Sequence, residues 1–506
     1  MRLRALLLAL PFNLHSLYLS HAFPAPSAVP APRMSLGAAT SAAVEENIRS
    51  SASWEYDWRE HWYPVGFEED FPKGSREPWG MSIFDEPLAL FRDGEDELRC
   101  VQDLCPHRLT KLSEGKVFDG NIECQYHGWQ MEGKEGKCVR IPQLEEGAVI
   151  PKSACVRTFP LGIKEGIVWV WMGTSAITKE VPCSVDDLDT NKDVSFINRF
   201  VVDLPYDHSY LLENLLDQAH IPISHDATSG GGSRDKAKAL KFEVDDSSIS
   251  ADGFKAKILN LAGDGSTPTM YNFDAPCVIR VRTQSKFTFG GTLHCIPVGQ
   301  GRSRLLFMTY ILNAPAAITL ALRLKPKFLL NLNACKILEQ DLKMITAQED
   351  HFARTGQSWD EACLPISGID PLVVEYRKWL DKVGQGMPWY EGWTSHNNVA
   401  RREGGRGSAL DTRTSGHRGQ ESRYWRHVRL STSSKRGLRR VNLTKKVSAV
   451  VAVSAASAAA VTGAVPAVVV GVGAVAINAA ATRLEQCFYV NFERFPIQGT
   501  NFSYLR

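Results

Sequence analysis

The stretch "LCPHRLTKLSEGKVFDGNIECQYHGWQ", residues 104–130, decides the fold of the first ordered part of this chain. It contains the pattern C-x-H and, after a gap, the pattern C-x-x-H, which together comprise Cys105, His107, Cys124 and His127. Glycines close to both patterns place them in loops. Thiolate sulfur and imidazole nitrogen are ligands of zinc and of iron–sulfur centres. The stretch therefore predicts a metal centre held by two loops.

The order of the cysteines and histidines along the chain distinguishes between two kinds of metal centre. Zinc can take two cysteines and two histidines in a tetrahedral site, and zinc fingers usually keep the two cysteines together and the two histidines together. In a Rieske-type [2Fe–2S] cluster, two histidines replace two cysteines on one iron. Each loop here offers one cysteine and one histidine, so one iron can take both thiolates and the other both imidazoles. The pattern favours the cluster, which transfers single electrons, with a zinc-stabilised binding module as the alternative.

A destination for the electron is predicted about a hundred residues downstream, in "LLENLLDQAHIPISHD" (211–226). His220 and His225 follow Asn214 and Asp217. Two histidines and one carboxylate on one face of Fe(II) leave coordination positions open for O₂ and substrate. The spacing predicts a mononuclear iron site, although two histidines can also recur at this spacing without a metal.

The carboxylate of this site must come from farther along the chain. We expect it to be Asp341, in "ACKILEQDLKMITAQED" (334–350), on a predicted helix. Glu339, Glu349 and Asp350 compete with it, and spacing alone does not exclude them.

Composition excludes some classes of protein. A chain of 506 residues is long enough for two or three domains, and its net charge of +2 gives no indication of a nucleic-acid partner. Eleven cysteines spread along the chain do not resemble a disulfide-stapled scaffold. Arg2 and Arg4 precede an apolar run, and no acidic residue occurs before Glu45. This leader resembles the bipartite signal and transit peptide of algal plastids surrounded by extra membranes, with ordinary secretion as the alternative.

The C-terminal region has an unusual composition. Residues 392–446 are rich in Arg, Gly and Ser and predict a flexible basic linker. Residues 447–482 contain no charged side chain and exceed the roughly 20 apolar residues that one membrane span needs. Gly463 and Pro466 interrupt this run, which favours a transmembrane hairpin of two helices over one long helix. A buried or surface-lying helical pair is the alternative.

Taken together, these residues resemble the Rieske non-haem iron oxygenases. Within them the chain resembles the plant and algal plastid group of pheophorbide a oxygenase, the translocon-associated Rieske protein and the protochlorophyllide-dependent translocon component. The similarity runs from about Tyr56 to Trp389. It includes "CPHRLTKLSEG" (105–115), "CQYHGWQMEGKEGKCVRIPQ" (124–143), "FDAPC" (273–277) and "VEYRKWLDKVGQGMPWY" (374–390).

The resemblance implies an α+β fold in which a Rieske β-domain precedes a helix-grip domain, an antiparallel sheet wrapped over a long helix, and a membrane-anchor hairpin. The expected order is a signal and transit peptide (1–50), the Rieske [2Fe–2S] domain (54–175), the iron domain (176–391), the linker (392–446), the hairpin (447–482) and a tail (483–506). Cys105, His107, Cys124 and His127 would hold the cluster, and His220, His225 and Asp341 the iron. Asp217 and Asn214 are the expected catalytic residues. Asp217 would link the cluster of one subunit to the iron of the next in a head-to-tail homotrimer.

The resemblance also implies an activity. Ferredoxin would donate electrons to a monooxygenase that oxygenates a chlorophyll-derived tetrapyrrole of the pheophorbide, chlorophyllide or phyllobilin type. The enzyme would reside in a plastid membrane of an alga with a secondary plastid. The alternative is a Rieske electron-transfer or redox-sensing subunit of a plastid protein-import complex.

Two departures from this group stand out. Ser431 and Ser434 occupy the positions of a thioredoxin-responsive C-x-x-C pair, and a hydroxyl group cannot form a disulfide. We therefore expect that redox switch to be absent. "ATSGGGSRDKAKAL" (227–240) is Gly-rich where relatives carry bulkier residues, which is consistent with either a mobile lid over the iron or a surface loop.

Overall fold

The computed structural model describes residues 54–492, except for 184, 186–193, 227, 229–231, 261–267, 285–286, 385–386, 388, 395 and 399–421. The predicted leader lies outside the described residues. So do the middle of the predicted linker, most of the predicted tail and part of the Gly-rich stretch after His225.

The first part of the chain is built from short antiparallel strands in three small sheets. One sheet has the order β1 (Trp62–Phe67), β10 (Ile167–Trp171), β9 (Leu161–Lys164), and a second contains β2 (Trp79–Ile83), β3 (Glu86–Arg92) and β4 (Leu98–Gln102). The third contains β5 (Lys116–Phe118), β6 (Asn121–Glu123), β7 (Gln130–Met131) and β8 (Cys138–Arg140). The 3₁₀ turns η1 (Glu68–Asp70) and η2 (Leu112–Glu114) connect them. This is the predicted β-domain.

The second part is a seven-stranded antiparallel sheet with the order β11-β17-β16-β15-β14-β13-β12. Its strands are β11 (Val194–Leu204), β12 (Leu240–Val244), β13 (Gly253–Asn260), β14 (Thr269–Asp274), β15 (Val278–Gln284), β16 (Thr288–Gly299) and β17 (Arg302–Leu312). Strand β14 alternates buried and half-buried residues, as expected when one face meets a core. The turns η3 (Arg234–Lys236) and η4 (Asp246–Ser248) lie between strands.

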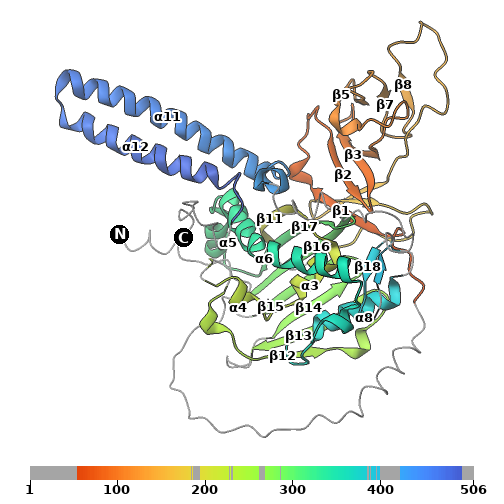
Figure 1. Cartoon of the computed structure of the whole chain (residues 1–506). Coiled ribbons are helices and arrows are strands. Elements are labelled where there is room, and N and C mark those ends of the chain that lie inside the picture. Colours follow the sequence, from red (N-terminus) through yellow and green to blue (C-terminus); the bar gives the residue numbers. More distant parts are fainter. Residues whose placement is uncertain are drawn as a thin grey trace, which may run out of the picture.

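Helices cover this sheet, and the long α6 (Lys327–Thr355) crosses it (Figure 1). The others are α3 (His208–Leu216), α4 (Ile221–Ser224), α5 (Ala316–Arg323), α7 (Trp359–Ala362) and α8 (Pro371–Val383), followed by the ribbon β18 (Trp389–Glu391) and β19 (His396–Asn398). A sheet wrapped over one long helix confirms the α+β fold expected from the sequence.

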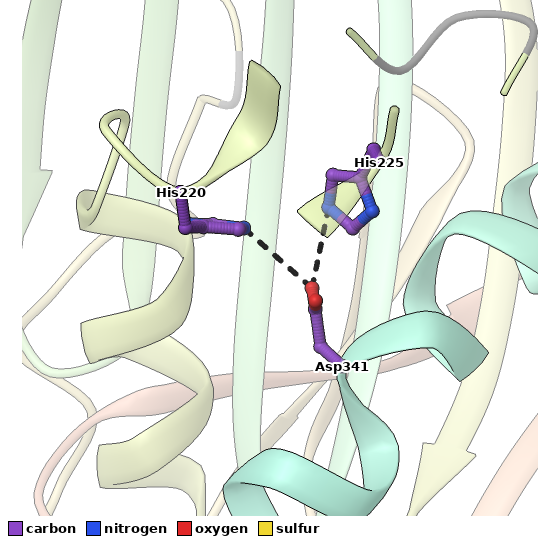
Figure 2. Close-up of side chains that lie close together, drawn as sticks. All are labelled: His220, His225 and Asp341. Carbon is purple, nitrogen blue, oxygen red and sulfur yellow. Dashed lines mark ion pairs between the residues drawn. The ribbon is translucent and has the colours of Figure 1, made fainter. Parts of the chain in front are cut away.

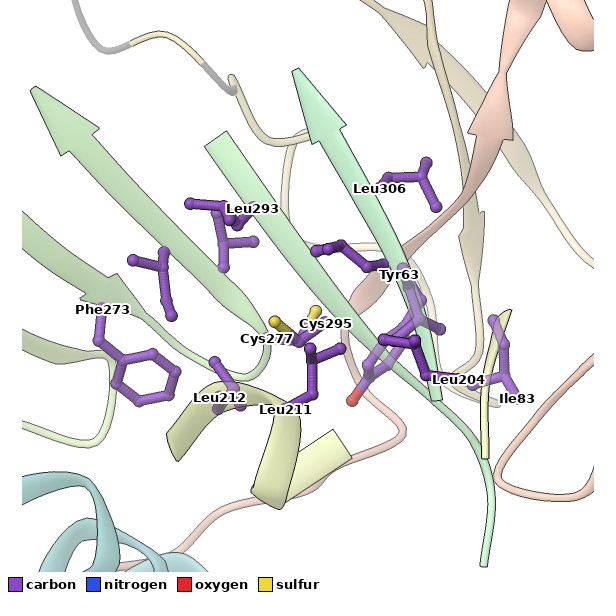
Figure 3. Packing of buried hydrophobic residues seen from close by; sticks show 14 of the residues in the cluster. Tyr63, Ile83, Leu204, Leu211, Leu212, Phe273, Cys277, Leu293, Cys295 and Leu306 are labelled. Atoms are coloured by element: carbon purple, nitrogen blue, oxygen red, sulfur yellow. The ribbon is translucent and has the colours of Figure 1, made fainter. Parts of the chain in front are cut away.

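One continuous core joins the two parts. Figure 3 shows Leu211 and Leu212 of α3 pointing towards Cys277, in the turn before β15, and Cys295 of β16, all at most 1% exposed, with Tyr63 of β1 close by. The β2–β3 turn is also bonded to the end of β16: the Phe84 and Asp85 N–H groups donate to the carbonyls of Pro297 and Val298 at 2.8 and 3.1 Å. The β-domain is therefore packed against the sheet rather than linked to it by a free segment.

The C-terminal region forms the predicted helical hairpin. Helix α11 (Thr432–Thr462) ends at Gly463, whose φ of 66° suits a residue without a Cβ, and α12 (Val465–Gln486) begins with a proline in its first turn. Both helices are long and apolar enough to cross a membrane by length and composition, and only 11% of each apolar window is buried within the protein. Figure 1 shows the pair projecting away from the rest of the molecule.

Over residues 422–446 the structure differs from the flexible linker predicted for residues 392–446. Tyr424–Val428 form a π-helical turn, η5, and α11 already begins at Thr432. We call the packed ends of the hairpin, residues 422–446 and 483–492, the foot. The composition was misleading because Arg423 and Arg426 are not solvated: their side chains are 3% and 2% exposed and pair with a carboxylate on α6.

The foot packs directly on the first half of α6. Phe328 stacks on Phe488 with ring centroids 5.9 Å apart, and Leu332 lies in the same apolar cluster as Leu438. Gly437 allows this contact, because a Cβ there would come within 2.5 Å of the Phe328 ring.

The two serines at the expected cysteine positions have structural partners. Ser431 caps α11 by accepting a hydrogen bond from the Ser434 N–H at 3.4 Å, and the Ser434 hydroxyl lies 2.7 Å from Nε2 of buried His427. The described cysteines are all free.

A buried carboxylate at the start of α11 generates a prediction. Asp70 Oδ1 accepts a hydrogen bond from the Thr432 N–H at 2.6 Å, and burial raises the pKa of Asp70 to about 7. The folded state therefore keeps the Asp70 proton at pH values where the unfolded chain has lost it, so this contribution to stability falls as the pH rises towards 7. From pH 5 to pH 7 this contribution falls by about 2 kcal/mol, so the melting temperature should fall by about 4–8 °C.

This prediction is checked by thermal unfolding of the detergent-solubilised chain between pH 5 and pH 8. Asp70→Asn should lack this component, whereas Glu77→Gln, a change at an exposed carboxylate of the same domain, should keep it. Parallel curves for wild type and Asp70→Asn would assign the titration to another group.

Candidate metal centres

The two loops of the first site have the same backbone design. The Leu109 N–H donates to the Cys105 carbonyl at 2.8 Å, and the Gly128 N–H donates to the Cys124 carbonyl at 2.9 Å. Leu109 and Gly128 both have positive φ, 58° and 72°. Since a positive φ is uncommon for leucine, this conformation is held by its surroundings, as often occurs at functional sites.

This design brings the four predicted ligands together. Cys105 and Cys124 are 2% and 1% exposed and lie in contact, and the rings of His107 and His127 are 4.5 Å apart between centroids. Trp129 stacks on His107 at 4.7 Å. Two buried sulfurs below two more exposed imidazoles match a binuclear cluster with one sulfur-bound and one nitrogen-bound iron.

The electrostatics of the cysteines suit a cationic group. Burial raises the pKa of the Cys105 thiol to about 11, despite the opposing effect of the His107 N–H, and neighbouring Cys124 adds to the rise. A buried pair of thiolates therefore requires a positive partner, which the irons of a [2Fe–2S] cluster would supply.

The second site lies where α3 ends. Asp217 caps α3 and accepts hydrogen bonds from the N–H groups of Ala219 and His220 at 2.8 and 3.3 Å, which turns the chain sharply. The short α4 begins after His220, has Pro222 in its first turn and ends at His225. These two turns place the histidines on the same side of the chain.

Asp341 of α6 completes the site. Figure 2 shows His220 and His225 converging on its carboxylate, and their Nε2 atoms lie 3.5 and 3.2 Å from Asp341 Oδ2. Within the described part of the chain these three form the one group of at least three ligating side chains whose ligand atoms all lie within 4.8 Å of one another. The side chains of His225 and Asp341 are 5% and 3% exposed, and that of His220 is 18% exposed.

The competing carboxylates lie elsewhere. Glu339 is bound by two arginines, and Glu349 Oε1 accepts a hydrogen bond from the Asp207 N–H at 3.2 Å. Asp350 does not belong to the group of three ligands. Among the four residues that spacing allowed, the geometry therefore selects Asp341.

The surroundings of Asp341 and His220 stabilise the charged forms of both side chains. Burial opposes ionisation, but His220 and His225 lower the pKa of Asp341 to about 2. Burial likewise opposes charging of His220, yet the Asp217 and Asp341 carboxylates raise its pKa to about 10. Asp341 Oδ1 is buried and has no hydrogen-bond partner among the described residues. A donor set of two imidazoles and one carboxylate with a free oxygen fits a metal ion such as Fe(II).

Two predicted residues lie against these ligands. Asn214 Nδ2 donates to Asp341 Oδ2 at 3.4 Å, and Asp217 Oδ2 lies 3.2 Å from His220 Nδ1. The Asp217 side chain is 30% exposed, so it contacts both the ligand and the surface.

Gln340 also contacts an iron ligand, and no pattern in the sequence predicted it. Its Nε2 donates to Thr228 Oγ1 at 2.7 Å, so its Oε1 faces Nδ1 of His225 at 2.8 Å and accepts the proton from it. This arrangement leaves the Nε2 lone pair of His225 free for a metal. No spacing rule identifies such a residue, because Gln340 and His225 are 115 positions apart.

Comparisons with known proteins agree with both sites. The Rieske [2Fe-2S] domain family matches residues 61–160, which include the four ligands of the first site. The pheophorbide a oxygenase family matches residues 273–359, which include Asp341. Chloroplastic pheophorbide a oxygenase of Arabidopsis thaliana is 30% identical over 380 residues, covering 68% of this chain and 67% of that protein.

The chain belongs to the pheophorbide a oxygenase family of Rieske-type oxygenases. Its residues accordingly fit both cofactors of that family, a [2Fe–2S] cluster and a mononuclear iron.

Two other relatives carry names other than pheophorbide a oxygenase. The chloroplastic protein TIC 55 of Arabidopsis thaliana is 40% identical over 348 residues, covering 67% of this chain and 62% of that protein. Chloroplastic chlorophyllide a oxygenase of Chlamydomonas reinhardtii is 28% identical over 372 residues, covering 69% of this chain and 50% of that protein. The match spans about three fifths of the length of TIC 55 from Arabidopsis and from Pisum sativum.

A solved structure supports the fold. Dicamba monooxygenase bound to dicamba superposes with a TM-score of 0.51 at 20% identity, covering 66% of this chain and 98% of that one. At this identity, the similarity shows that the β-domain and the sheet-over-helix domain share one fold with it.

Substitution of Gln340 tests whether it orients His225 for iron binding. Gln340→Leu removes the acceptor for the His225 Nδ1 proton, so the imidazole loses its fixed tautomer and orientation. The affinity for ferrous iron should fall about 10–100-fold. Anaerobic equilibrium dialysis measures this affinity, with Gln357→Leu, an exposed change just beyond α6, as the matched control. Equal iron affinity in both variants would show that Gln340 does not orient the ligand.

Proposed function

We propose that this chain is a Rieske-type monooxygenase that uses O₂ and ferredoxin-derived electrons to oxygenate a chlorophyll-derived tetrapyrrole. In this proposal Cys105, His107, Cys124 and His127 hold the [2Fe–2S] cluster, and His220, His225 and Asp341 hold Fe(II). The cluster supplies single electrons, and the iron supplies the activation of O₂.

The observation that carries the proposal is the set of three ligands at the second site. Two imidazoles and one carboxylate leave open positions on an iron ion, and an electron carrier alone has no need for them. The tetrapyrrole substrate class rests on the relatives, because pheophorbide a oxygenase and chlorophyllide a oxygenase bear such substrates in their names.

The chain's own residues have distinct roles in this scheme. His107 and His127 lie at the outer end of the cluster loops, where an electron donor can approach. Asp217 holds His220 from the side opposite Asp341 and reaches the surface, so it is placed to connect His220 with a histidine of another subunit's cluster. Asn214 keeps Asp341 Oδ2 oriented.

The location and assembly belong to the same proposal. The relatives are chloroplast proteins, and the two apolar helices suit a plastid membrane, here assigned to an alga with a secondary plastid. A head-to-tail homotrimer would place the exposed side of Asp217 against the cluster loops of a neighbouring subunit.

A second candidate function is an electron-transfer or redox-sensing subunit of a plastid protein-import complex. The 40% identity to TIC 55 favours it. The complete ligand set at the second site favours the oxygenase.

The two functions are separated by isotope labelling. The full-length protein, loaded with cluster and iron, is reduced and mixed with ¹⁸O₂ and a panel of pheophorbide, chlorophyllide and phyllobilin pigments, and products are identified by mass spectrometry. The oxygenase predicts one ¹⁸O atom in a pigment product and none in the His225→Ala variant. Cluster oxidation without any labelled product, from a protein whose iron site is filled, would favour the electron-transfer subunit.

Asp217 provides a sharper prediction within this scheme. Asp217→Asn should retain both metals but reduce product formation at least about 10-fold, because the neutral amide no longer supports His220 during electron transfer. Product yield and iron content are measured together, with exposed Asp235→Asn as control. Loss of iron from Asp217→Asn would instead show that Asp217 is needed to hold the metal and not for electron transfer alone.

A further inference from the structure

Both ends of the C-terminal hairpin meet at one carboxylate on α6. Before α11, Arg423 donates to Glu339 through Nε at 2.9 Å and through Nη2 at 2.5 Å, and Arg426 Nη2 donates at 2.8 Å. After α12, the Phe492 N–H donates to the same carboxylate at 2.7 Å. The side chains of Glu339, Arg423 and Arg426 are at most 3% exposed.

Further bonds join the two ends of the hairpin to each other. Arg426 Nη2 also donates to Asn491 Oδ1 at 2.8 Å, and Arg423 donates to the Cys487 carbonyl. The foot is therefore one unit, and Glu339 is its charged contact with α6.

The face of α6 that meets the foot is separate from the face that meets the iron ligands. Phe328, Leu332, Cys335 and Glu339 recur at the three- and four-residue steps of one helical face, and all four border the foot. Gln340 and Asp341 follow Glu339 immediately, and each helical residue turns by about 100°. The foot and the histidines of the iron site therefore contact the same turn of α6 on different faces.

We infer that Glu339, Arg423 and Arg426 are positioning residues of the iron site, and that the foot of the membrane hairpin sets where Asp341 and Gln340 lie. A packed helix moves as a body, so any shift that relieves the contact at Glu339 also displaces the two residues that follow it. Replacing Glu339 by a neutral residue leaves two buried guanidinium groups without their counter-charge, which α6 or the foot must move to accommodate. The inference rests on the proposed assignment of iron to His220, His225 and Asp341.

The test compares two carboxylates that each bridge two arginines. Glu339→Gln is matched by Glu86→Gln in the β-domain, because Glu86 pairs with Arg59 at 2.8 Å and with Arg157 at 3.1 Å and is 15% exposed. Both variants are made in the full-length chain in lipid nanodiscs. Ferrous affinity is measured by anaerobic dialysis, and the geometry of the iron site is followed by electron paramagnetic resonance of the Fe(II) protein treated with nitric oxide.

Glu339→Gln should weaken ferrous binding at least about 10-fold and change the resonance of the iron that remains, while the absorbance of the [2Fe–2S] cluster stays as in wild type. Glu86→Gln should lose thermal stability but keep both iron readouts. A Glu339→Gln protein that melts earlier yet binds iron with wild-type affinity and an unchanged resonance would overturn the inference, because the contact would then serve stability alone.

Two milder variants keep the test informative if Glu339→Gln does not fold. Arg423→Lys and Arg426→Lys retain the charge but lose the planar fork that matches a carboxylate. Each should shift the resonance and weaken iron binding less than Glu339→Gln. Wild-type iron properties in both would count against the inference. Failure of the wild-type protein to bind iron at all would instead contradict the proposed function, so the two failures are distinguishable.

Discussion

Among the buried carboxylates of α6, Glu339 and Asp341 lie two positions apart, and the structure depends on the partners that each of them has. Asp341 faces two histidines from the end of α3 and α4, and Glu339 faces two arginines from the C-terminal segment. A buried carboxylate is tolerated only when opposite charge or hydrogen bonds compensate it. The two compensations come from segments that precede and follow α6 in the sequence, so the helix is held in place from both sides.

The pattern of the sequence was informative where ligands lie close together along the chain. C-x-H with C-x-x-H, and His220 with His225, are local spacings, and the loops and turns that present them have local causes such as Gly128 and Pro222. Asp341 could be narrowed only to four candidates, because its pairing spans more than a hundred residues. Periodicity predicted the helix that carries Asp341, whereas an antiparallel sheet wrapped over that helix was expected only from resemblance to a known family.

What the sequence did not predict is long-range polar pairing. Gln340 has no recognisable spacing to His225, and its role appears only when α6 and α4 are brought together. The foot was mistaken for a linker because a segment rich in Arg, Gly and Ser is usually solvated, whereas Arg423 and Arg426 find their counter-charge 84 and 87 positions upstream. Composition indicates how a segment behaves when it is surrounded by water. Here the arginines are instead buried against Glu339 of α6.

Because α11 is one unbroken helix, it fixes the distance between the folded body and the charge-free run as well as joining the two. The helix runs from the packed foot at Thr432 into the charge-free run that begins at Val447 without a break. Fifteen helical residues correspond to about 22 Å. The foot is part of the folded body, so this length acts as a rigid spacer and not as a tether. With the charge-free run in lipid, the iron ligands would be held in the aqueous phase at a constant distance and tilt from the bilayer. A molecule dissolved in that bilayer would have to leave it to reach them.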